Sequence, residues 1–163
     1  MSITAEMDLT GVRQLISFTV GAEEYGLELR QVKEIIRMGQ ITRLPRAPEC
    51  VKGIINLRGQ VIPIVDLRQR FGLPRAEDTV MTRVIVVEAG GVPVGLVVDS
   101  ASQVVRVPMD QIEPPPPFLG THAGDFIDGV GKLDDRIIIT VDAARILSLD
   151  ELSEISGSLK AAV

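Results

Sequence analysis

Two aspartates are the residues of this sequence whose types and positions come nearest to a catalytic pair. Asp66 and Asp142 each follow an apolar run, and two carboxylates that lie close together can share a proton, as in aspartic proteases. That site also needs a small hydroxyl residue and a glycine after each aspartate, but Leu67 follows Asp66 and Ala143 follows Asp142. An aspartate between a strand and a helix is a preferred N-cap. We therefore predict two helix caps instead of a catalytic pair.

The other reactive residue types do not form a recognisable site. The chain has one histidine, His122, and one cysteine, Cys50, which excludes a multi-histidine or multi-cysteine metal site. We interpret Cys50 as a small packing residue. Residues 129–132 have the wrong spacing for a phosphate-binding loop and precede a leucine. The sequence predicts no enzymatic activity, no metal and no cofactor.

Composition narrows the class of partner. The chain has 163 residues and a formal net charge of −5, whereas nucleic acids and anionic membranes recruit basic surfaces. Only 3% of the residues are aromatic, which also disfavours a stacking platform for bases. The apolar run 89–98 is about half as long as a membrane-spanning helix requires. We expect a cytoplasmic protein that binds other proteins, without nucleic acid and without direct membrane insertion.

An internal repeat organises the elements that must position any site. Residues 13–71 align with residues 82–147, first at an offset of 69 positions and then, after an insertion, at an offset of 76. The aligned positions are mostly glycines and core aliphatics, such as Gly26 with Gly95 and Gly53 with Gly129. The pattern favours a duplication that produces two similar halves.

Each half has the pattern of a small closed barrel of about five short strands. Residues 16–20 alternate apolar and polar, which predicts a half-buried strand, whereas residues 84–87 are apolar throughout and predict a strand covered on both faces. Short helices are expected over 67–71 and 143–147, each after its aspartate, and a further amphipathic helix is expected over 149–155.

These elements give a domain plan. Residues 1–12 are expected to be a flexible N-terminus and residues 13–150 a single domain. The first barrel is expected mainly within 13–81 and the second mainly within 82–148, with exchange of strands at the boundary left open. Residues 149–163 are expected to form a C-terminal helix and tail. The role of the proline run 114–117 and of the loop that carries His122 stays open.

The run 51–68, Val-Lys-Gly-Ile-Ile-Asn-Leu-Arg-Gly-Gln-Val-Ile-Pro-Ile-Val-Asp-Leu-Arg, closely resembles the signature stretch of the CheW-like family of bacterial chemotaxis coupling proteins. Further matching stretches follow the family's order: 25–27, 32–35, 41–45 and 94–99. The resemblance covers about residues 13–150. It implies a mainly β fold of two pseudo-symmetric SH3-like five-stranded barrels with a hydrophobic core between them, short connecting helices and a short C-terminal helix.

The resemblance also implies a function. CheW-like proteins are non-enzymatic adaptors that couple the cytoplasmic tip of methyl-accepting chemoreceptors to the regulatory domain of the histidine kinase CheA, and transmit receptor state to kinase activity. It implies a cytoplasmic protein recruited to receptor arrays at the inner membrane. By match to family positions, the kinase-binding residues are Val32, Glu34, Gly53 and Arg58, and the receptor-binding residues are Arg58, Gly95 and Val104.

Several alternatives stay open. A CheW-like adaptor could serve a non-flagellar chemosensory pathway, such as surface motility or development, and nothing in the sequence separates the two. A small-ligand barrel would need a deep pocket lined by converging polar groups. Val32, Gly95 and Val104 also fit ordinary core or turn positions. The receptors and attractants, and the oligomeric state of the free protein, are not indicated by the sequence.

Overall fold

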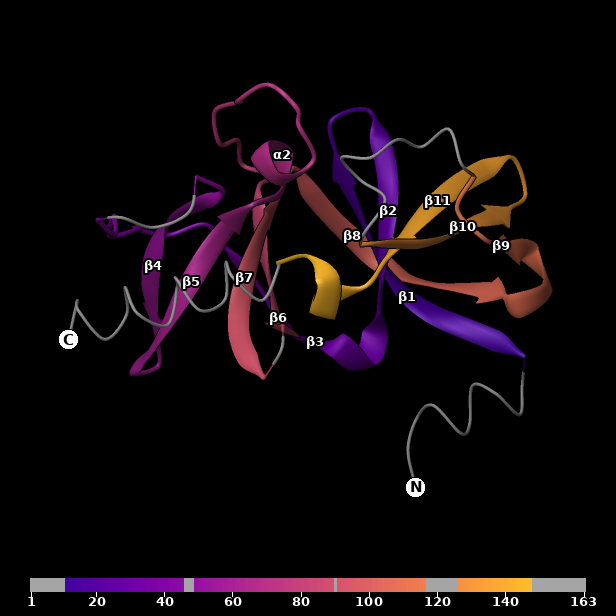
Figure 1. Cartoon of the computed structure of the whole chain (residues 1–163), viewed down its shortest axis with the longest axis horizontal. Coiled ribbons are helices and arrows are strands. Elements are labelled where there is room, and N and C mark those ends of the chain that lie inside the picture. Colours follow the sequence, from indigo (N-terminus) through magenta and orange to yellow (C-terminus); the bar gives the residue numbers. More distant parts are fainter. Residues whose placement is uncertain (1–10, 46–48, 90, 117–125, 148–163) are drawn as a thin grey trace.

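The computed structural model describes residues 11–45, 49–89, 91–116 and 126–147. The predicted C-terminal helix, residues 1–10 of the flexible N-terminus predicted over 1–12, and the His122 loop lie outside the described residues. Residue 12 of that predicted segment belongs to a strand, which begins at Val12. Figure 1 shows two β structures side by side along the longest axis of the molecule, with β4 and β5 in one and β9 and β10 in the other.

The first barrel is a five-stranded sheet in the order β3-β6-β7-β5-β4. Its strands are β3 (Val32–Arg37), β4 (Val51–Leu57), β5 (Gln60–Asp66), β6 (Arg83–Ala89) and β7 (Val92–Val98). Neighbouring strands are antiparallel except β5 and β7, which are parallel. After β3 the chain returns to the far edge, where Thr42 and Ile54 exchange two backbone hydrogen bonds of 2.9 and 2.7 Å. This bridge closes the sheet and removes an exposed edge.

The second barrel repeats the same arrangement in the order β8-β1-β2-β11-β10-β9. Its strands are β1 (Val12–Val20), β2 (Glu23–Glu28), β8 (Ser100–Pro108), β9 (Ile112–Glu113), β10 (Ile127–Leu133) and β11 (Arg136–Val141). The parallel pair is now β2 and β11. The two-residue strand β9 pairs with β10 as Thr42 pairs with β4, so this sheet has six strands where the five-stranded barrel has an isolated bridge.

Local details confirm the sequence repeat. Gly53 in β4 and Gly129 in β10 lie at bulges of the same kind, at the offset of 76 positions found in the sequence. At the same offset, Arg58 and Asp134 both adopt positive φ, at 51° and 56°. The pseudo-symmetry therefore extends from strand order to single backbone angles.

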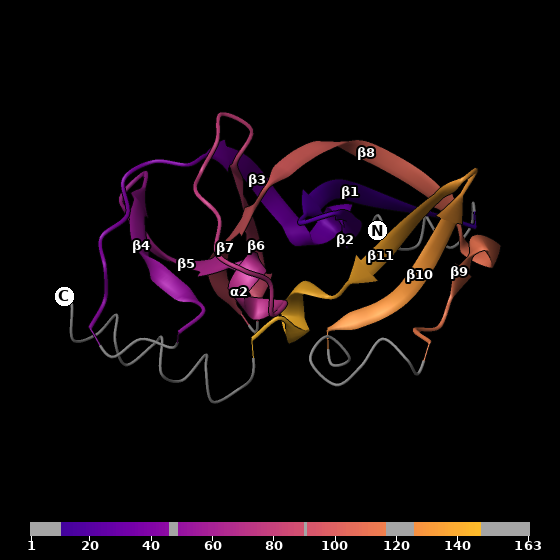
Figure 2. The same ribbon diagram turned by 90° about the horizontal axis from the view of Figure 1, so that it is seen from above.

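The barrels do not follow the halves of the repeat. β1 and β2 come from the first half but pair with β8 and β11, whereas β6 and β7 come from the second half and pair with β3 and β5. Figure 2 shows β8 beginning beside the first barrel and extending along β1 as part of the second barrel. The sheets therefore differ from the barrel limits of 13–81 and 82–148, because each half contributes two strands to the barrel of the other half.

Short helices join the strands. In the described residues, α2 (Leu67–Arg70) is a single turn, and the other helical elements are 3-10 turns: η1 (Leu29–Gln31), η2 (Met109–Gln111) and η4 (Ala143–Arg145). The prediction of N-caps is confirmed, because Asp66 accepts the N–H of Arg68 and Asp142 accepts that of Ala144, both at 3.0 Å. The helix predicted over 143–147 is thus a 3-10 turn that ends at Arg145.

Among the described residues, three apolar clusters form the core. The five-stranded barrel encloses Ile62, Ile64, Val84, Val86 and Val97, and the six-stranded barrel encloses Leu15, Val105, Val107 and Ile138. A third and larger cluster includes residues from both sheets, such as Phe18 and Ile85. β6 is covered on both faces, as predicted, because Val84 faces one cluster and Ile85 another.

The prediction of a half-buried strand at 16–20 is wrong. Leu15 and Ser17 are as fully buried as Ile16 and Phe18. The reason is that one face of β1 packs inside its barrel while the other packs against the shared cluster. A polar Ser17 is tolerated on the inner side because its hydroxyl hydrogen-bonds Glu24.

An aromatic series crosses the shared cluster. Tyr25 stacks on Phe18 with ring centroids 5.7 Å apart and contacts Phe71 at 4.8 Å, and Phe71 stacks on Phe126 at 5.0 Å. Phe71 follows α2 of the first barrel, whereas Phe126 precedes β10 of the second. Offset aromatic contacts at these distances are favourable. The series therefore ties the two barrels together.

Candidate interaction surfaces

The turn between β4 and β5 presents a cation in a fixed position. Arg58 and Gly59 both have positive φ, and Asn56 accepts the N–H of Gly59 at 2.8 Å. A two-residue turn with positive φ at both positions matches the twist of a hairpin. The Arg58 side chain is 70% exposed and forms an ion pair with Glu34 of β3. Two of the predicted site residues therefore meet on one surface, across the two edge strands of the first barrel.

Gly53 lies in a place where no side chain fits. It is buried, its φ is 155°, and a Cβ built on it would lie 2.3 Å from the carbonyl oxygen of Thr42. The backbone of β4 thus approaches Thr42 closely enough for the bridge that closes the barrel. Gly53 therefore acts through the backbone of β4, and it offers no side-chain contact of its own.

The remaining predicted residues divide between core and surface. Val32 is partly buried and packs against the shared cluster. Gly95 is buried in β7, where an added Cβ would lie 2.6 Å from the Ile64 side chain inside the first barrel. Val104 in β8 is 46% exposed, on the sheet of the second barrel. Of the predicted receptor residues, Arg58 and Val104 are therefore the ones that a partner could touch.

Sequence reasoning missed two exposed aliphatic residues of the first barrel. Ile35 in β3 is 40% exposed and follows Glu34 directly, and Val61 at the start of β5 is 39% exposed. The two-residue period of β3 would have placed Ile35 on the outer face with Lys33 and Arg37. Glu34 is on the other face of β3, so Ile35 does not adjoin the ion pair, whereas Val61 follows the turn that carries Arg58 by two residues. An exposed aliphatic side chain close to such a turn is typical of a protein–protein contact.

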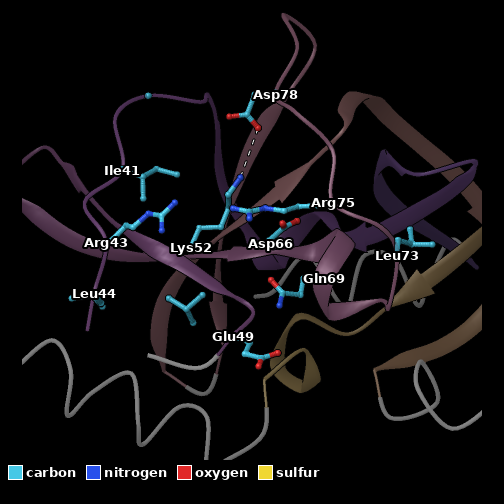
Figure 3. A pocket seen from close by; sticks show the side chains of 12 residues that line it. Ile41, Arg43, Leu44, Glu49, Lys52, Asp66, Gln69, Leu73, Arg75 and Asp78 are labelled. Carbon is cyan, nitrogen blue, oxygen red and sulfur yellow. Dashed lines mark ion pairs between the residues drawn. The ribbon is translucent and has the colours of Figure 1, made fainter. Parts of the chain in front are cut away.

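A polar cleft opens on another part of the first barrel. It has a volume of about 800 Å³ and is lined by twelve residues, among them Arg43, Lys52, Asp66 and Arg75. Figure 3 shows these side chains, with an ion pair of 3.8 Å between Lys52 and Asp78. None of the residues predicted from the family resemblance lines it.

No catalytic or metal constellation accompanies these surfaces in the described part of the chain. Within those ranges there is no group of three or more His, Cys, Asp or Glu side chains that could hold a metal ion. Asp66 and Asp142 each cap their own helical turn. Among the described helices, none has the length and apolar character needed to cross a membrane.

A salt bridge with an added backbone hydrogen bond connects the two barrels beside the shared cluster. Arg68 of α2 donates two hydrogen bonds to Asp99, of 2.9 and 2.7 Å, and Asp99 also accepts the N–H of Gly21 at 2.9 Å. Asp99 lies between β7 and β8, and Gly21 lies between β1 and β2. Burial alone raises the pKa of Asp99, but the hydrogen bonds from Arg68 and Gly21 outweigh it and lower the pKa below its ordinary value.

The salt bridge between Arg68 and Asp99 predicts that the stability of the fold depends on pH. A carboxylate whose pKa is lower in the folded state stabilises above its unfolded pKa, near 3.9, and that contribution is lost as pH falls through the folded pKa. We expect Asp99→Asn to reduce the free energy of unfolding by about 1–2 kcal/mol at pH 7, and by less below pH 4. Urea unfolding across this pH range measures the effect. Asp110→Asn, at an exposed position, is the control, and an equal loss at pH 3 and pH 7 would contradict the role of ionised Asp99.

The two closed barrels around a common core, with an exposed ion pair and exposed apolar side chains, define a class of β-rich binding module. Comparison with known proteins identifies the family: residues 14–151 match the CheW-like domain model. The chain belongs to the CheW-like domain family. Its members in chemotaxis are scaffolding adaptors and not enzymes, and the chain is accordingly a non-enzymatic chemotaxis adaptor.

Relatives cover most of this chain. "Chemotaxis protein CheW" of Klebsiella aerogenes is 39% identical over 151 residues, which are 91% of this chain and 89% of the relative. "Chemotaxis protein CheW" of Bacillus subtilis is 35% identical over 89% of this chain and 92% of the relative. "Protein FrzA" of Myxococcus xanthus is 33% identical over 72% of this chain and 73% of the relative.

A solved structure has the same architecture. The crystal structure of the scaffolding protein TtCheW from Thermoanaerobacter tengcongensis superposes with a TM-score of 0.79 and is 36% identical, covering 85% of this chain and 94% of that one. The resemblance seen in the signature stretch 51–68 and the predicted mainly β fold of two SH3-like barrels are therefore both confirmed.

Proposed function

We propose that this chain couples chemoreceptors to the histidine kinase CheA and passes receptor state to the kinase. The observation that carries the proposal is the exposed ion pair between Arg58 and Glu34, built on the signature stretch that the chain shares with its family. A planar guanidinium on a rigid turn can exchange one carboxylate partner for another without any change of fold. Such an exchange suits an adaptor that binds and transmits but catalyses nothing.

The proposed kinase surface is the side of the first barrel around β3 and the β4–β5 turn. Glu34 and Arg58 would contact the regulatory domain of CheA directly, with Val61, two residues after the turn, as an exposed apolar neighbour. Gly53 and Val32 would act through the backbone bridge and the packing beneath this surface. A mixed surface of this kind, with charge at an apolar edge, is suited to a specific but reversible contact.

The proposed receptor surface combines Arg58 with Val104 of β8, while Gly95 allows close packing of Ile64 and Val84 inside the first barrel. The receptor would contribute its helical cytoplasmic tip, laying apolar side chains over Val104 and a carboxylate near Arg58. The chain would then be recruited from the cytoplasm to receptor arrays at the inner membrane. A non-flagellar pathway is the second candidate, supported by the match to FrzA over a smaller share of the chain.

Arg58→Glu tests the proposal. We expect the variant to fold normally, because Arg58 is 70% exposed, and to weaken assembly with receptor and CheA by roughly tenfold or more, since Glu34 would then face a second carboxylate. Co-sedimentation with receptor-containing membranes and kinase activation, each partner being omitted in turn, measure the effect. Lys132→Glu, in the corresponding hairpin of the second barrel, is the control. Full ternary assembly by Arg58→Glu would refute the proposed surface.

A further inference from the structure

The turn that carries Arg58 departs from the residue types that its conformation prefers. Leu57 pairs with Gln60, so Arg58 and Gly59 form a two-residue loop, with φ of 51° and 86°. Positive φ at both positions is the type I′ geometry, which favours asparagine, aspartate or glycine at the first position and glycine at the second. Gly59 fits this preference, but Arg58 does not, because a Cβ is crowded in the left-handed region. The chain therefore holds a long cation at a position where its backbone conformation is disfavoured.

A side chain of the preceding strand stabilises this disfavoured turn. Asn56 is exposed, and its carboxamide oxygen accepts the N–H of Gly59 at 2.8 Å. That N–H belongs to the peptide bond between Arg58 and Gly59, so the contact fixes the peptide directly after the Cα of Arg58. Side chains of asparagine commonly hold turns through local hydrogen bonds to the backbone. The hydrogen bond therefore offsets part of the cost of placing Arg58 in the left-handed region.

The corresponding hairpin of the second barrel reaches the same backbone angle with different residues. At the offset of 76 positions, Asp134 takes the place of Arg58, with a φ of 56°, and Lys132 takes the place of Asn56. Aspartate tolerates the left-handed region better than arginine does. Lysine has no acceptor atom, and the Lys132 ammonium instead pairs with Glu113 of β9 at 2.5 Å. The side-chain hydrogen bond to the turn thus accompanies the hairpin in which an arginine must be held.

We propose that Asn56 is a positioning residue that holds Arg58 ready for binding to partner proteins. The inference rests on the proposed function, in which Arg58 contacts those partners. Asn56 keeps the turn in one conformation, and from this turn the Arg58 guanidinium reaches a carboxylate, as it reaches Glu34 of β3 in the free chain. A group that is already held in its binding geometry loses less conformational entropy when it binds. Asn56 therefore contributes to affinity through Arg58, without a contact of its own to the partner.

A double-mutant cycle tests whether Asn56 acts through Arg58. We expect Asn56→Ala to fold normally, because the side chain is exposed, and to weaken binding to CheA by about fivefold. In a chain that already carries Arg58→Ala, the same substitution should change the affinity by less than about twofold, because the side chain that Asn56 positions is gone. Titration calorimetry of the four full-length chains with CheA measures the affinities, and circular dichroism checks that each variant folds.

A second measurement follows the hydrogen bond itself. Hydrogen exchange of the Gly59 amide, measured by NMR, should be several times faster in Asn56→Ala than in the wild type. Asn56→Asp keeps an acceptor oxygen and should leave this exchange slow. Lys132→Ala, at the corresponding position of the second barrel, is the control for binding and should keep the affinity of the wild type.

The possible outcomes separate this inference from the proposed function. Equal losses from Asn56→Ala in the two backgrounds would make Asn56 an independent contact and would overturn the inference. Unchanged affinity of Asn56→Ala, while Arg58→Ala binds more weakly, would overturn the inference and leave the proposed surface intact. Unchanged exchange of the Gly59 amide would also overturn it. If Arg58→Ala binds CheA as tightly as the wild type, the proposed surface itself is wrong, and the role of Asn56 is wrong with it.

Discussion

Phe126→Ala is expected to lower the free energy of unfolding by about 3–5 kcal/mol, the usual cost of deleting a buried phenyl ring. Phe126 is 1% exposed, its ring stacks on Phe71 at 5.0 Å, and the Arg70 guanidinium lies 5.5 Å from its centroid on the first-barrel side. The deletion therefore removes hydrophobic burial, a ring contact and a cation–π contact at once. Because the lost contacts lie between the two barrels, we expect both barrels to be destabilised together.

Chemical denaturation followed by circular dichroism measures this effect. Ile137→Ala is the control, because Ile137 is 61% exposed and such surface substitutions usually change stability by less than about 0.5 kcal/mol. A single transition at lower denaturant is expected for Phe126→Ala. A loss below about 1 kcal/mol would show that the cavity collapses without cost and that the aromatic series does not join the barrels.

Gly53→Ala is expected to reduce stability by about 2–4 kcal/mol and also to weaken kinase binding. The added Cβ would lie 2.3 Å from the Thr42 carbonyl oxygen and 2.6 Å from the Ile41 side chain, at a φ of 155° that L-residues rarely adopt. Relief of this clash requires the chain at Thr42 to move away from β4. The two backbone hydrogen bonds of the bridge between Thr42 and Ile54 would then be lost.

Substitutions at two other glycines distinguish backbone strain from steric collision as causes of the lost stability. Gly91 has a φ of 82° and open space around it, so Gly91→Ala measures backbone strain alone, at about 1 kcal/mol. Gly39 has neither positive φ nor a close neighbour, so Gly39→Ala should change stability little. Denaturation and binding to the CheA regulatory domain measure the series. Normal stability of Gly53→Ala together with a loss of kinase binding would instead make Gly53 a direct contact.

Local features of the fold could be predicted from the sequence. The period-two and all-apolar runs located the strands, and the position of Asp66 and Asp142 between strand and helix predicted both N-caps, because these signals depend on neighbouring residues. The offset of 76 positions that pairs Gly53 with Gly129 predicted the repeat that the bulges later displayed. Each of these predictions needed only residues close in sequence or a simple alignment.

Long-range pairing could not be predicted in the same way. Parallel pairing of β2 with β11, and of β5 with β7, joins segments far apart in the chain, and nothing in their side chains specifies the partner. For the same reason the second covered face of β1 was missed, because Leu15 packs on strands from the other half of the repeat. The contact of Arg68 with Asp99 also depends on this exchange, since α2 and the β7–β8 junction meet only in the assembled fold.

For the candidate site, the sequence indicated which positions matter better than it indicated what each residue does there. The pairing of Arg58 with Glu34 gives two of the family positions a shared surface, but whether partners bind there stays a prediction. Gly53 and Gly95 were expected at contacts, yet each lies where a Cβ would collide with its own barrel. A sequence shows that a glycine is present, but only coordinates show which atoms come close to it.

The exchange of strands means that neither half of the repeat is a self-sufficient unit. A chain severed between residues 81 and 82 would yield one fragment with β1 to β5 and another with β6 to β11, and each fragment would hold incomplete portions of two barrels. Either fragment could complete its sheets only by association, with the other fragment or with a second copy of itself.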